Sequence, residues 1–543
     1  MKFKYYHFIL FWFLLNLFQA ATTELTSDEG YYWFYASQLD WGFYDHPPLL
    51  ALLIKLGSAI FSSELGVRLF NIVLISLSLF PFLKLFPERV LKEKTIYIAL
   101  LAFPLFNYIT FIAFPDSPLI AFSVLFLWAY KRFLERKDWF STIVMGIALA
   151  LMLYAKYHAV LLVPIVLISN WRLLKNLKFY VFVALSVVLY IPHLLWQIEH
   201  DFVSFTYHLK GRARTFKFDY ITQYITQQIV VIGPFIVLAF LYKVKTQFDK
   251  TLKYLIIGIF GFFLLMSIRG FVHLHWTSLA IFPLLILTVR YVSEKNKQRI
   301  FLRIGIPFAL LILMFRLYLS FHIFPFNNLN VDYYHDRALW AEDIEQIAYN
   351  RPVIFEKQLR EAPLYSFYSQ DKEGVALYPG IGKKSEYEIR NYEDQLQGKD
   401  VLVVKDKPFP KSTALITRMG KEVHYLEVDE LNSFLNIKTE IKSQEIKNGR
   451  HIFELAIKNH RNRELVFDNV SLLIHTINAD NEVKNHFLSK LNFTIQSNSS
   501  KEIIAKIALE KFSENERYDA YFYFMDGICF SSITSEKIQI QTP

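Results

Sequence analysis

The feature that most constrains this chain is a series of apolar stretches between residues 5 and 321. Most are about 16–22 residues long, the length of helix that crosses the hydrocarbon core of a bilayer. The chain has 543 residues, of which 53% are hydrophobic and only 20% charged, values that exclude an ordinary soluble domain. We predict about eleven spans, the first near 5–23 and the others near 66–84, 95–114, 117–133, 140–156, 158–170, 179–198, 226–242, 254–271, 276–292 and 301–321.

The connectors between these stretches predict how the chain crosses the membrane. Every second connector is short and rich in Lys and Arg, which favours the cytoplasmic side: 87–94, 131–137, 171–178, 243–253 and 293–299. The formal net charge of +10 is therefore read as a topology signal, and we expect no nucleic acid partner. The start of the chain resembles either a cleaved signal peptide or an uncleaved first helix, and the many later spans favour the second. We thus expect a multi-pass protein of the inner (plasma) membrane with a cytoplasmic N-terminus.

An odd number of spans places everything after about residue 325 outside the cytoplasm. Residues 338–430 combine a helical opening with two short buried runs, PVIFE and DVLVVKD, which are typical of an α/β domain. Later runs alternate apolar and polar residues, as in HIFELAIKN and RYDAYFYFM, which indicates an antiparallel β-sandwich. We predict three domains, a transmembrane domain 1–325, an extracytoplasmic α/β domain 326–435 and a β-sandwich-like domain 436–543. The one cysteine, Cys529, is interpreted as an apolar filler.

Ionisable residues are scarce in the membrane part, yet many fall at the outward ends of the predicted spans. Such groups cost several kcal/mol in the membrane unless they are paired or hydrated. Their gathering on one side predicts a polar cavity that opens outward, beneath the C-terminal domains. The residues are Asp28, Glu29, Asp45, His46, Asp116, Lys156, His158, His193, His200, Arg269, His273 and His275.

Each of these positions also has a purely structural interpretation. Asp28 and Glu29 follow Thr26 and could cap the helix that starts there, or one could act as a base. Asp45 and His46, before a double proline, could bind a divalent metal or contact a phosphate, but two ligands do not make a metal site.

Asp116 in FPDSP could likewise cap a helix. Lys156 could extend to the interface or bind the phosphate of a lipid headgroup, aided by Arg212 and Arg214.

Four segments together resemble a known family: DEGYYWFYASQLDWGFYDHPPLLALL, FPDSPLIAFSVLFLWAYKRF, LYAKYHAVLLVP and HLHWTSLA. They are similar to the bacterial members of the dolichyl-phosphate-mannose protein mannosyltransferase superfamily. These are C-type glycosyltransferases (GT-C fold), and their relatives include the aminoarabinose transferase of lipid A. The resemblance covers roughly residues 5–430, and the part after about 440 matches no family that we can name.

The resemblance implies a polyprenyl-phosphate sugar as donor and a lipid, glycan or protein as acceptor on the outer face. By its motif positions, Asp28 is the expected base, with Glu29 and Asp116 as further catalytic acids. Lys156 falls where the family binds the lipid phosphate, and Asp45 and His46 replace a Glu-Lys pair of the aminoarabinose relatives. We expect substrate binding by Asp45, His46, Lys156, Tyr157, His158, Arg212, Arg214, His273 and His275. Whether a divalent metal takes part stays open, with Asp45 and His46 as its candidate ligands.

Two other classes of protein fit part of this pattern. A transporter or flippase of a lipid-linked glycan also needs many spans and intramembrane charges, but it is expected to hold them at mid-depth and often shows inverted repeats. A membrane anchor for the C-terminal domain needs far fewer spans. The one-sided gathering of acids and bases favours the glycosyltransferase.

Overall fold

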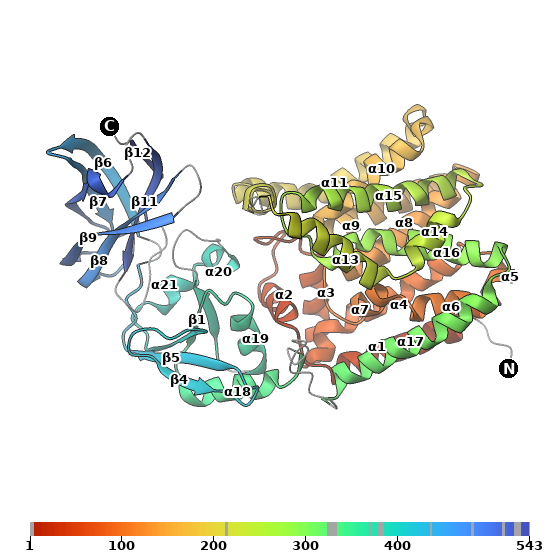
Figure 1. Ribbon diagram of the computed structural model, residues 1–543, viewed down its shortest axis with the longest axis horizontal. Helices are drawn as coiled ribbons and strands as arrows, with labels where there is room; N and C mark the ends of the chain where they lie inside the picture. Colours follow the sequence, from red (N-terminus) through yellow and green to blue (C-terminus); the bar gives the residue numbers. More distant parts are fainter. Residues whose placement is uncertain are drawn as a thin grey trace. The chain divides into compact units, whose positions relative to one another are not determined.

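The computed structural model describes residues 5–211, 216–322, 334–369, 372–377, 385–434, 437–478, 483–512, 516–525 and 534–541. The chain forms two compact units, Met1–Arg337 and Ala338–Pro543 (Figure 1). The first unit is helical and the second is rich in strands, as the sequence predicts. The predicted domain boundaries near 325 and 435 both fall outside the described residues, so the three-domain division stays a prediction.

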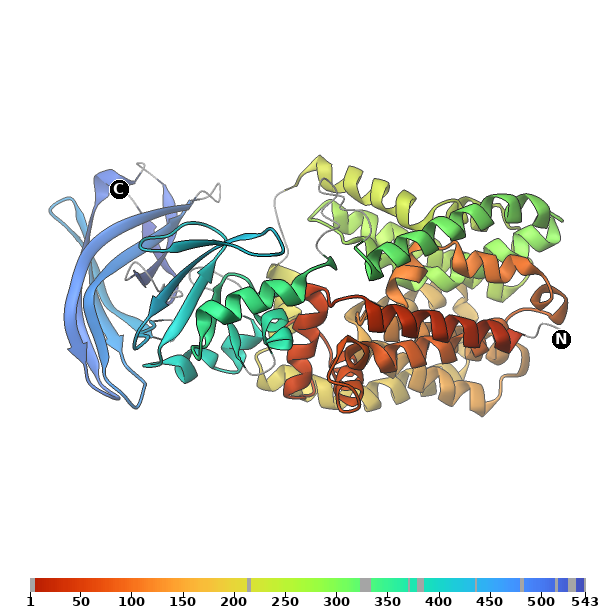
Figure 2. The same ribbon diagram turned by 90° about the horizontal axis from the view of Figure 1, so that it is seen from below.

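The first unit is a bundle of apolar helices that run along one direction (Figure 2). In the described part of the chain, six segments are long and apolar enough to cross a membrane on their own, and two bent helix pairs could raise this number to eight. The predicted count of eleven spans stays a prediction. The six are α4 (Glu64–Leu83), α8 (Asp116–Arg136), α11 (Leu177–Glu199), α15 (Gln247–Ser267), η4 (Leu274–Ala280) continued by α16 (Ile281–Glu294), and α17 (Gln298–Ser320).

Several predicted spans are broken, and the breaks have local causes. The stretch 95–114 divides into α6 (Lys94–Leu101) and α7 (Pro104–Ile109), because Pro104 begins a new helix. The stretch 226–242 bends by 83° between α13 (Phe218–Ile232) and α14 (Phe235–Leu241), where Gly233 adopts a positive φ before Pro234. The same kind of bend, 91°, separates α1 (Tyr5–Thr22) from α2 (Ser27–Ser37), so α2 crosses the end of the bundle.

The remaining helices of the first unit are short. They comprise α3 (Leu49–Ser58), α5 (Glu88–Leu91), α9 (Trp139–Ala155), η1 (Tyr157–Leu161), α10 (Leu162–Ser169), η2 (Trp171–Lys175), α12 (Val203–Thr206) and η3 (Tyr207–Gly211). Of the six long apolar segments, η4–α16 is the most central, because 89% of its apolar stretch is buried inside the bundle. For α17 the buried share is 17%, so this helix lies at the periphery.

The bundle has two ends that can be identified by side-chain contacts. Helix α8 begins at Asp116, and we call the end of the bundle that contains this residue the Asp116 end. At the opposite end, Arg290 of α16 pairs with Asp249 at the start of α15 and donates to the carbonyl of Leu85, just after α4. We call this the Asp249 end. The 20 residues of α4 span about 30 Å between the two ends. All five basic connectors lie at the Asp249 end, since they follow α4, α8 and α16 or precede α11 and α15.

The second unit contains a five-stranded sheet with the order β2-β1-β3-β5-β4. Strands β1 (Val353–Glu356), β2 (Gly374–Leu377) and β3 (Val401–Lys405) are parallel, and β4 (Thr413–Ile416) and β5 (Glu422–Val428) complete it in antiparallel pairing. The helices of this part are α18 (Arg337–Ala348), α19 (Glu361–Tyr368), α20 (Glu386–Ile389) and α21 (Tyr392–Leu396). The predicted α/β character is confirmed.

The last part of the chain forms two antiparallel sheets, with the orders β10-β7-β6 and β12-β11-β8-β9. Their inward side chains, such as Phe453 and Leu455 from one sheet and Ile474 and Phe522 from the other, share one core. This is the predicted sandwich. Its strands are β6 (Lys438–Lys447), β7 (Arg450–Lys458), β8 (Leu465–Ile477), β9 (Val483–Ile495), β10 (Ser500–Ala508), β11 (Arg517–Met525) and β12 (Ile538–Gln541). A turn, η6 (Leu509–Lys511), follows β10, and Cys529 lies outside the described residues.

Candidate functional site

Asp116 is the centre of a buried polar cluster at the end of the bundle named after it. Its side chain is fully buried and accepts a 2.7 Å hydrogen bond from the Lys156 ammonium on Oδ2 and a 2.6 Å bond from the Ser278 hydroxyl on Oδ1. The His275 Nε2 atom lies 3.8 Å from the same carboxylate. Lys156 is only 5% exposed, so it does not extend to the interface. Its acidic partner is Asp116, which lies 40 residues away in the sequence. The cap interpretation of Asp116 is not realised, because its carboxylate binds the ends of two other helical segments.

His275 connects this cluster to the loop before the double proline. Its ring lies 5.7 Å from the Phe114 ring, and Phe114 in turn meets the Tyr32 ring at 6.3 Å. The Tyr32 hydroxyl is 3.0 Å from His46 Nε2. Residues from four segments of the chain thus meet at one end of the bundle.

Asp45 and His46 are both held by tyrosines of α2. The Tyr35 hydroxyl donates to the Asp45 carboxylate at 2.7 Å, and the Tyr32 hydroxyl lies at hydrogen-bond distance, 3.0 Å, from His46 Nε2. His208 lies at hydrogen-bond distance, 2.8 Å, from the backbone carbonyl of Asp45. The loop 40–46 is therefore fixed from two sides, by α2 and by the chain near α12.

Tyr157 and His158 follow Lys156 directly and point to different neighbours. The Tyr157 hydroxyl is 3.1 Å from His193 Nε2, and its ring meets the His208 ring at 5.4 Å. The His158 ring lies 5.3 Å from Trp276, which also contacts His273. All the predicted substrate-binding residues of the described chain therefore lie in this region.

Two further members of the sequence set lie beside the loop 40–46. His193 contacts the carbonyl of Trp41 at 2.6 Å, and the Trp196 indole donates to Asp40 at 2.8 Å. His200 stacks on the Trp196 ring at 4.2 Å. Arg269 follows α15 and is exposed. Arg212 and Arg214 lie outside the described residues.

Asp28 and Glu29 are adjacent in sequence but differ in their surroundings. Asp28 is partly exposed and lies in the first turn of α2, the helix that carries Tyr32. Glu29 is fully buried and paired with Arg68, itself fully buried. Asp28 thus lies on the helix that contacts Phe114 through Tyr32 and is partly exposed, whereas Glu29 is fully enclosed.

Several residues that complete this region have only weak signals in the amino-acid sequence. Arg68 was hidden in an apolar stretch, and Ser278 and Tyr32 are neutral side chains in helices. One signal was available for Glu29, because Thr26-Ser-Asp-Glu has the spacing of a capping box, and the structure contains that box.

The described side chains form no metal-binding cluster. In the described part of the chain, no three His, Cys, Asp or Glu side chains lie together in a way that could hold one. The two candidate ligands, Asp45 and His46, have Tyr35 and Tyr32 as hydrogen-bond partners.

Comparison with known proteins gives the same picture as the motifs. Residues 45–196 match the family model described as dolichyl-phosphate-mannose-protein mannosyltransferase, a range that contains Asp116 and Lys156 and begins after Asp28. The crystal structure of ArnT from Cupriavidus metallidurans in the apo state covers 78% of this chain and 97% of its own, with a TM-score of 0.58 and 15% identity. The chain has the fold of ArnT. The resemblance predicted from the sequence is confirmed.

Two other relatives bear on the chemistry. The same ArnT bound to undecaprenyl phosphate matches with a TM-score of 0.57, 14% identity and the same shares of both chains. The lipid A galacturonosyltransferase RgtD of Rhizobium johnstonii is 28% identical over 191 residues, which is 33% of this chain. That match spans 40% of the relative's length.

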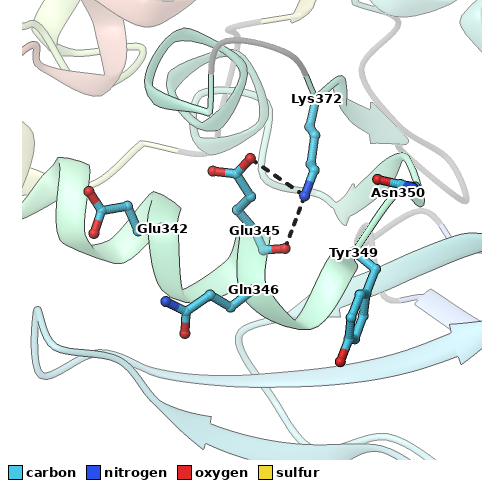
Figure 3. Close-up of a pocket in the computed structure, with 6 residues that line it drawn as sticks. All are labelled: Glu342, Glu345, Gln346, Tyr349, Asn350 and Lys372. Atoms are coloured by element: carbon cyan, nitrogen blue, oxygen red, sulfur yellow. Dashed lines mark hydrogen bonds and ion pairs between the residues drawn. The ribbon is translucent and has the colours of Figure 1, made fainter.

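A pocket in the second unit involves none of the predicted site residues. It is lined by side chains of α18 and its surroundings, namely Glu342, Glu345, Gln346, Tyr349, Asn350 and Lys372 (Figure 3). Lys372 pairs with the Glu345 carboxylate at 3.4 Å and donates to its carbonyl, and Glu342 pairs with Arg418.

Proposed function

We propose that this protein is a membrane glycosyltransferase that moves a sugar from a polyprenyl phosphate to an acceptor at the Asp116 end of the bundle. The observation that carries the proposal is the buried cluster of Asp116, Lys156 and His275, in a chain with the ArnT fold and with Asp28 on α2 at the same end of the bundle. The relatives support both sides of the reaction, since ArnT binds undecaprenyl phosphate and RgtD is named for adding galacturonosyl groups to lipid A.

The proposed transfer needs two kinds of group, a base for the acceptor hydroxyl and cations for the departing phosphate. In the transfer, an acceptor hydroxyl attacks the anomeric carbon of the sugar, the bond from that carbon to the phosphate oxygen breaks, and the hydroxyl loses its proton. Asp28, partly exposed, takes the proton as general base. The phosphate leaves with an added negative charge, which Lys156 and the histidines around it stabilise. Inversion at the sugar carbon is expected by analogy with the family.

The orientation of the bundle supports a site on the extracytoplasmic face. The five basic connectors all lie at the Asp249 end, which the positive-inside rule assigns to the cytoplasm. The Asp116 end then faces outward. The chain also leaves the first unit at this end, where the backbone N–H of Arg337 donates to Glu24 at 2.7 Å, which supports an extracytoplasmic location for the residues that follow.

The test is a transfer assay with purified protein. Undecaprenyl phosphate carrying galacturonic acid or a neutral hexose is offered with lipid A, and both released undecaprenyl phosphate and the mass of lipid A are measured. We expect transfer by the wild type and a fall in kcat of about 10²–10⁴-fold in Asp28→Asn. Movement of the intact glycolipid across a vesicle membrane without any transfer would contradict the proposal and favour a flippase.

A further inference from the structure

We infer that Glu29, with Arg68 as its partner, is a positioning residue that fixes Asp28 relative to Asp116. This inference rests on the proposed function, because it concerns the geometry of the same site. Glu29 was predicted from its motif to take part in catalysis, next to the expected base. Its contacts assign it a different task.

The Glu29 carboxylate is fully occupied by hydrogen bonds. Oε1 accepts from the Arg68 Nε atom at 2.6 Å and from the backbone N–H of Ala113 at 2.9 Å. Oε2 accepts from the second Arg68 nitrogen at 2.6 Å and from the backbone and side chain of Thr26 at 3.0 and 3.2 Å. A carboxylate has about four lone-pair positions, and these five contacts fill them. To act as a base, Glu29 would first have to break this network.

Arg68 extends the network to the end of α1. One of its terminal nitrogens donates to the carbonyls of Ala20 and Thr23 at 3.2 and 2.6 Å, and the other donates to the carbonyl of Glu24 at 2.9 Å. These carbonyls belong to the last turn of α1 and the residues after it, which have no helical partner. All five N–H groups of the guanidinium are therefore used.

Four segments of the chain are joined at this one pair: the end of α1, the start of α2, the first turn of α4 and the turn before α8. Asp28 is the residue directly before Glu29, and Asp116 lies three residues after Ala113. The Glu29–Arg68 pair is thus a shared attachment of the start of α2, which carries Asp28, and of the turn that leads to Asp116 at the start of α8. A displacement of about 1 Å between reacting groups can cost 100-fold in rate. Loss of Glu29 should therefore lower kcat although it touches no substrate.

The experiment compares Glu29→Gln with Asp28→Asn in the transfer assay on the full chain. For Glu29→Gln we expect kcat to fall about 100-fold with little change in KM, and the acidic limb of the pH–rate profile to stay at its wild-type position. For Asp28→Asn that limb should disappear. A profile in which Glu29→Gln also loses the limb would overturn the inference, since it would make Glu29 the base. Unchanged kcat in Glu29→Gln would overturn it as well.

Asp249→Asn is the matched control for destabilisation. Asp249 is also buried, also forms a capping box and also pairs with an arginine, but it lies at the other end of the bundle. It should lower the melting temperature in detergent much as Glu29→Gln does, with kcat of the folded protein unchanged. An equal loss of kcat in both variants would show a general effect of instability and overturn the assignment.

If Glu29→Gln does not fold, the more conservative variant Glu29→Asp provides the test. Glu29→Asp keeps the charge beside Arg68 but is one methylene shorter, so it cannot reach Arg68 and Ala113 together. Its kcat should fall at least tenfold with the acidic limb in place, and wild-type kcat would contradict the inference. Failure of the wild type to transfer sugar would instead contradict the proposed function, so the two failures are distinguishable.

Discussion

Two buried carboxylates, Glu29 and Asp249, are held in nearly the same way at opposite ends of the bundle. Each closes a capping box with a threonine three residues earlier, and each pairs with an arginine from another helix. Each arginine also donates to backbone carbonyls beyond a helix end, those after α1 for Arg68 and that of Leu85 for Arg290. The same construction thus fastens both ends of the bundle, so by itself it indicates stability and not catalysis.

What differs is the surroundings of the two pairs. Beside the Glu29–Arg68 pair, the same end of the bundle holds the partly exposed Asp28 and the Asp116–Lys156 pair, with several histidines, among them His46, His208, His273 and His275. Asp116 accepts two hydrogen bonds from described residues, whereas Glu29 accepts five. A carboxylate with unfilled lone pairs and a nearby cation can respond to a substrate. A saturated one cannot.

The largest effect is expected from breaking the Asp116–Lys156 pair. Asp116→Asn removes the carboxylate that binds the buried Lys156 ammonium, and breaking a buried ion pair costs about 3–5 kcal/mol of stability. Transfer should also fall by at least 100-fold, because the cation that would stabilise the leaving phosphate is misplaced. Melting curves and transfer rates of the purified variant measure both. Wild-type transfer by Asp116→Asn would remove the functional distinction between the two ends.

Asp249→Asn isolates the structural part of the comparison. Removing one partner of this buried pair should cost a similar 3–5 kcal/mol, because Arg290 keeps its charge. The transfer rate per folded molecule should stay at the wild-type value, since the site lies at the other end of α4. The check is kcat normalised to the folded fraction from size-exclusion chromatography. A selective loss of kcat would mean that the Asp249 end contributes to the reaction.

Gly42→Ala tests whether the loop 40–46 belongs to the functional end. A Cβ at this position would lie 2.3 Å from the Trp196 ring, so the loop or the ring must shift. Such overpacking typically costs about 1–3 kcal/mol. Because Asp45 and His46 move with the loop, KM for the polyprenyl-phosphate sugar should rise. An unchanged KM in steady-state kinetics would remove this loop from the binding site.

The smallest effect is expected from a partly exposed pair at the C-terminal end of α8, formed by Arg132 in its last turns and Asp138 just after it. The backbone N–H of Ser141 and the Arg132 guanidinium lower the pKa of Asp138 to about 2. A depressed carboxylate pKa stabilises the fold above its unfolded value of 3.8, and this contribution is lost as the pH falls toward 2. Asp138→Asn should lower the melting temperature slightly at neutral pH, less than either buried pair, and should leave transfer unchanged.

The wild type and Asp138→Asn should converge in melting temperature as the pH is lowered through this window. A difference that persists at pH 2 would assign the effect to the helix cap alone.

The amino-acid sequence predicts much of this molecule because its strongest signals are periodic or local. Apolar runs identify α4, α8, α11 and α17, and alternation identifies β7, β8, β10 and β11. The breaks at Pro104 and at Gly233–Pro234 were not predicted, although both residues are visible helix breakers, because the apolar character continues across them.

The site residues show the same difference between local signals, which the sequence contains, and contacts that depend on the fold. Asp116 and Lys156 could be chosen from the sequence because ionisable groups in apolar helices are costly and rarely without a task. Their pairing across 40 residues could not, since it depends on how α8 and α9 pack. Arg68 was missed for a related reason: one cation near the start of an apolar helix resembles an interfacial residue, and its burial against Glu29 is a property of the folded bundle.

The most direct measurement is an experimental structure, by cryo-electron microscopy, of the protein with undecaprenyl phosphate bound. The account predicts that the phosphate lies at the Asp116 end, within hydrogen-bond distance of Lys156 or of the histidines beside it, with Asp28 facing the sugar position. A phosphate bound at the Asp249 end, or one far from both Lys156 and Asp28, would contradict it.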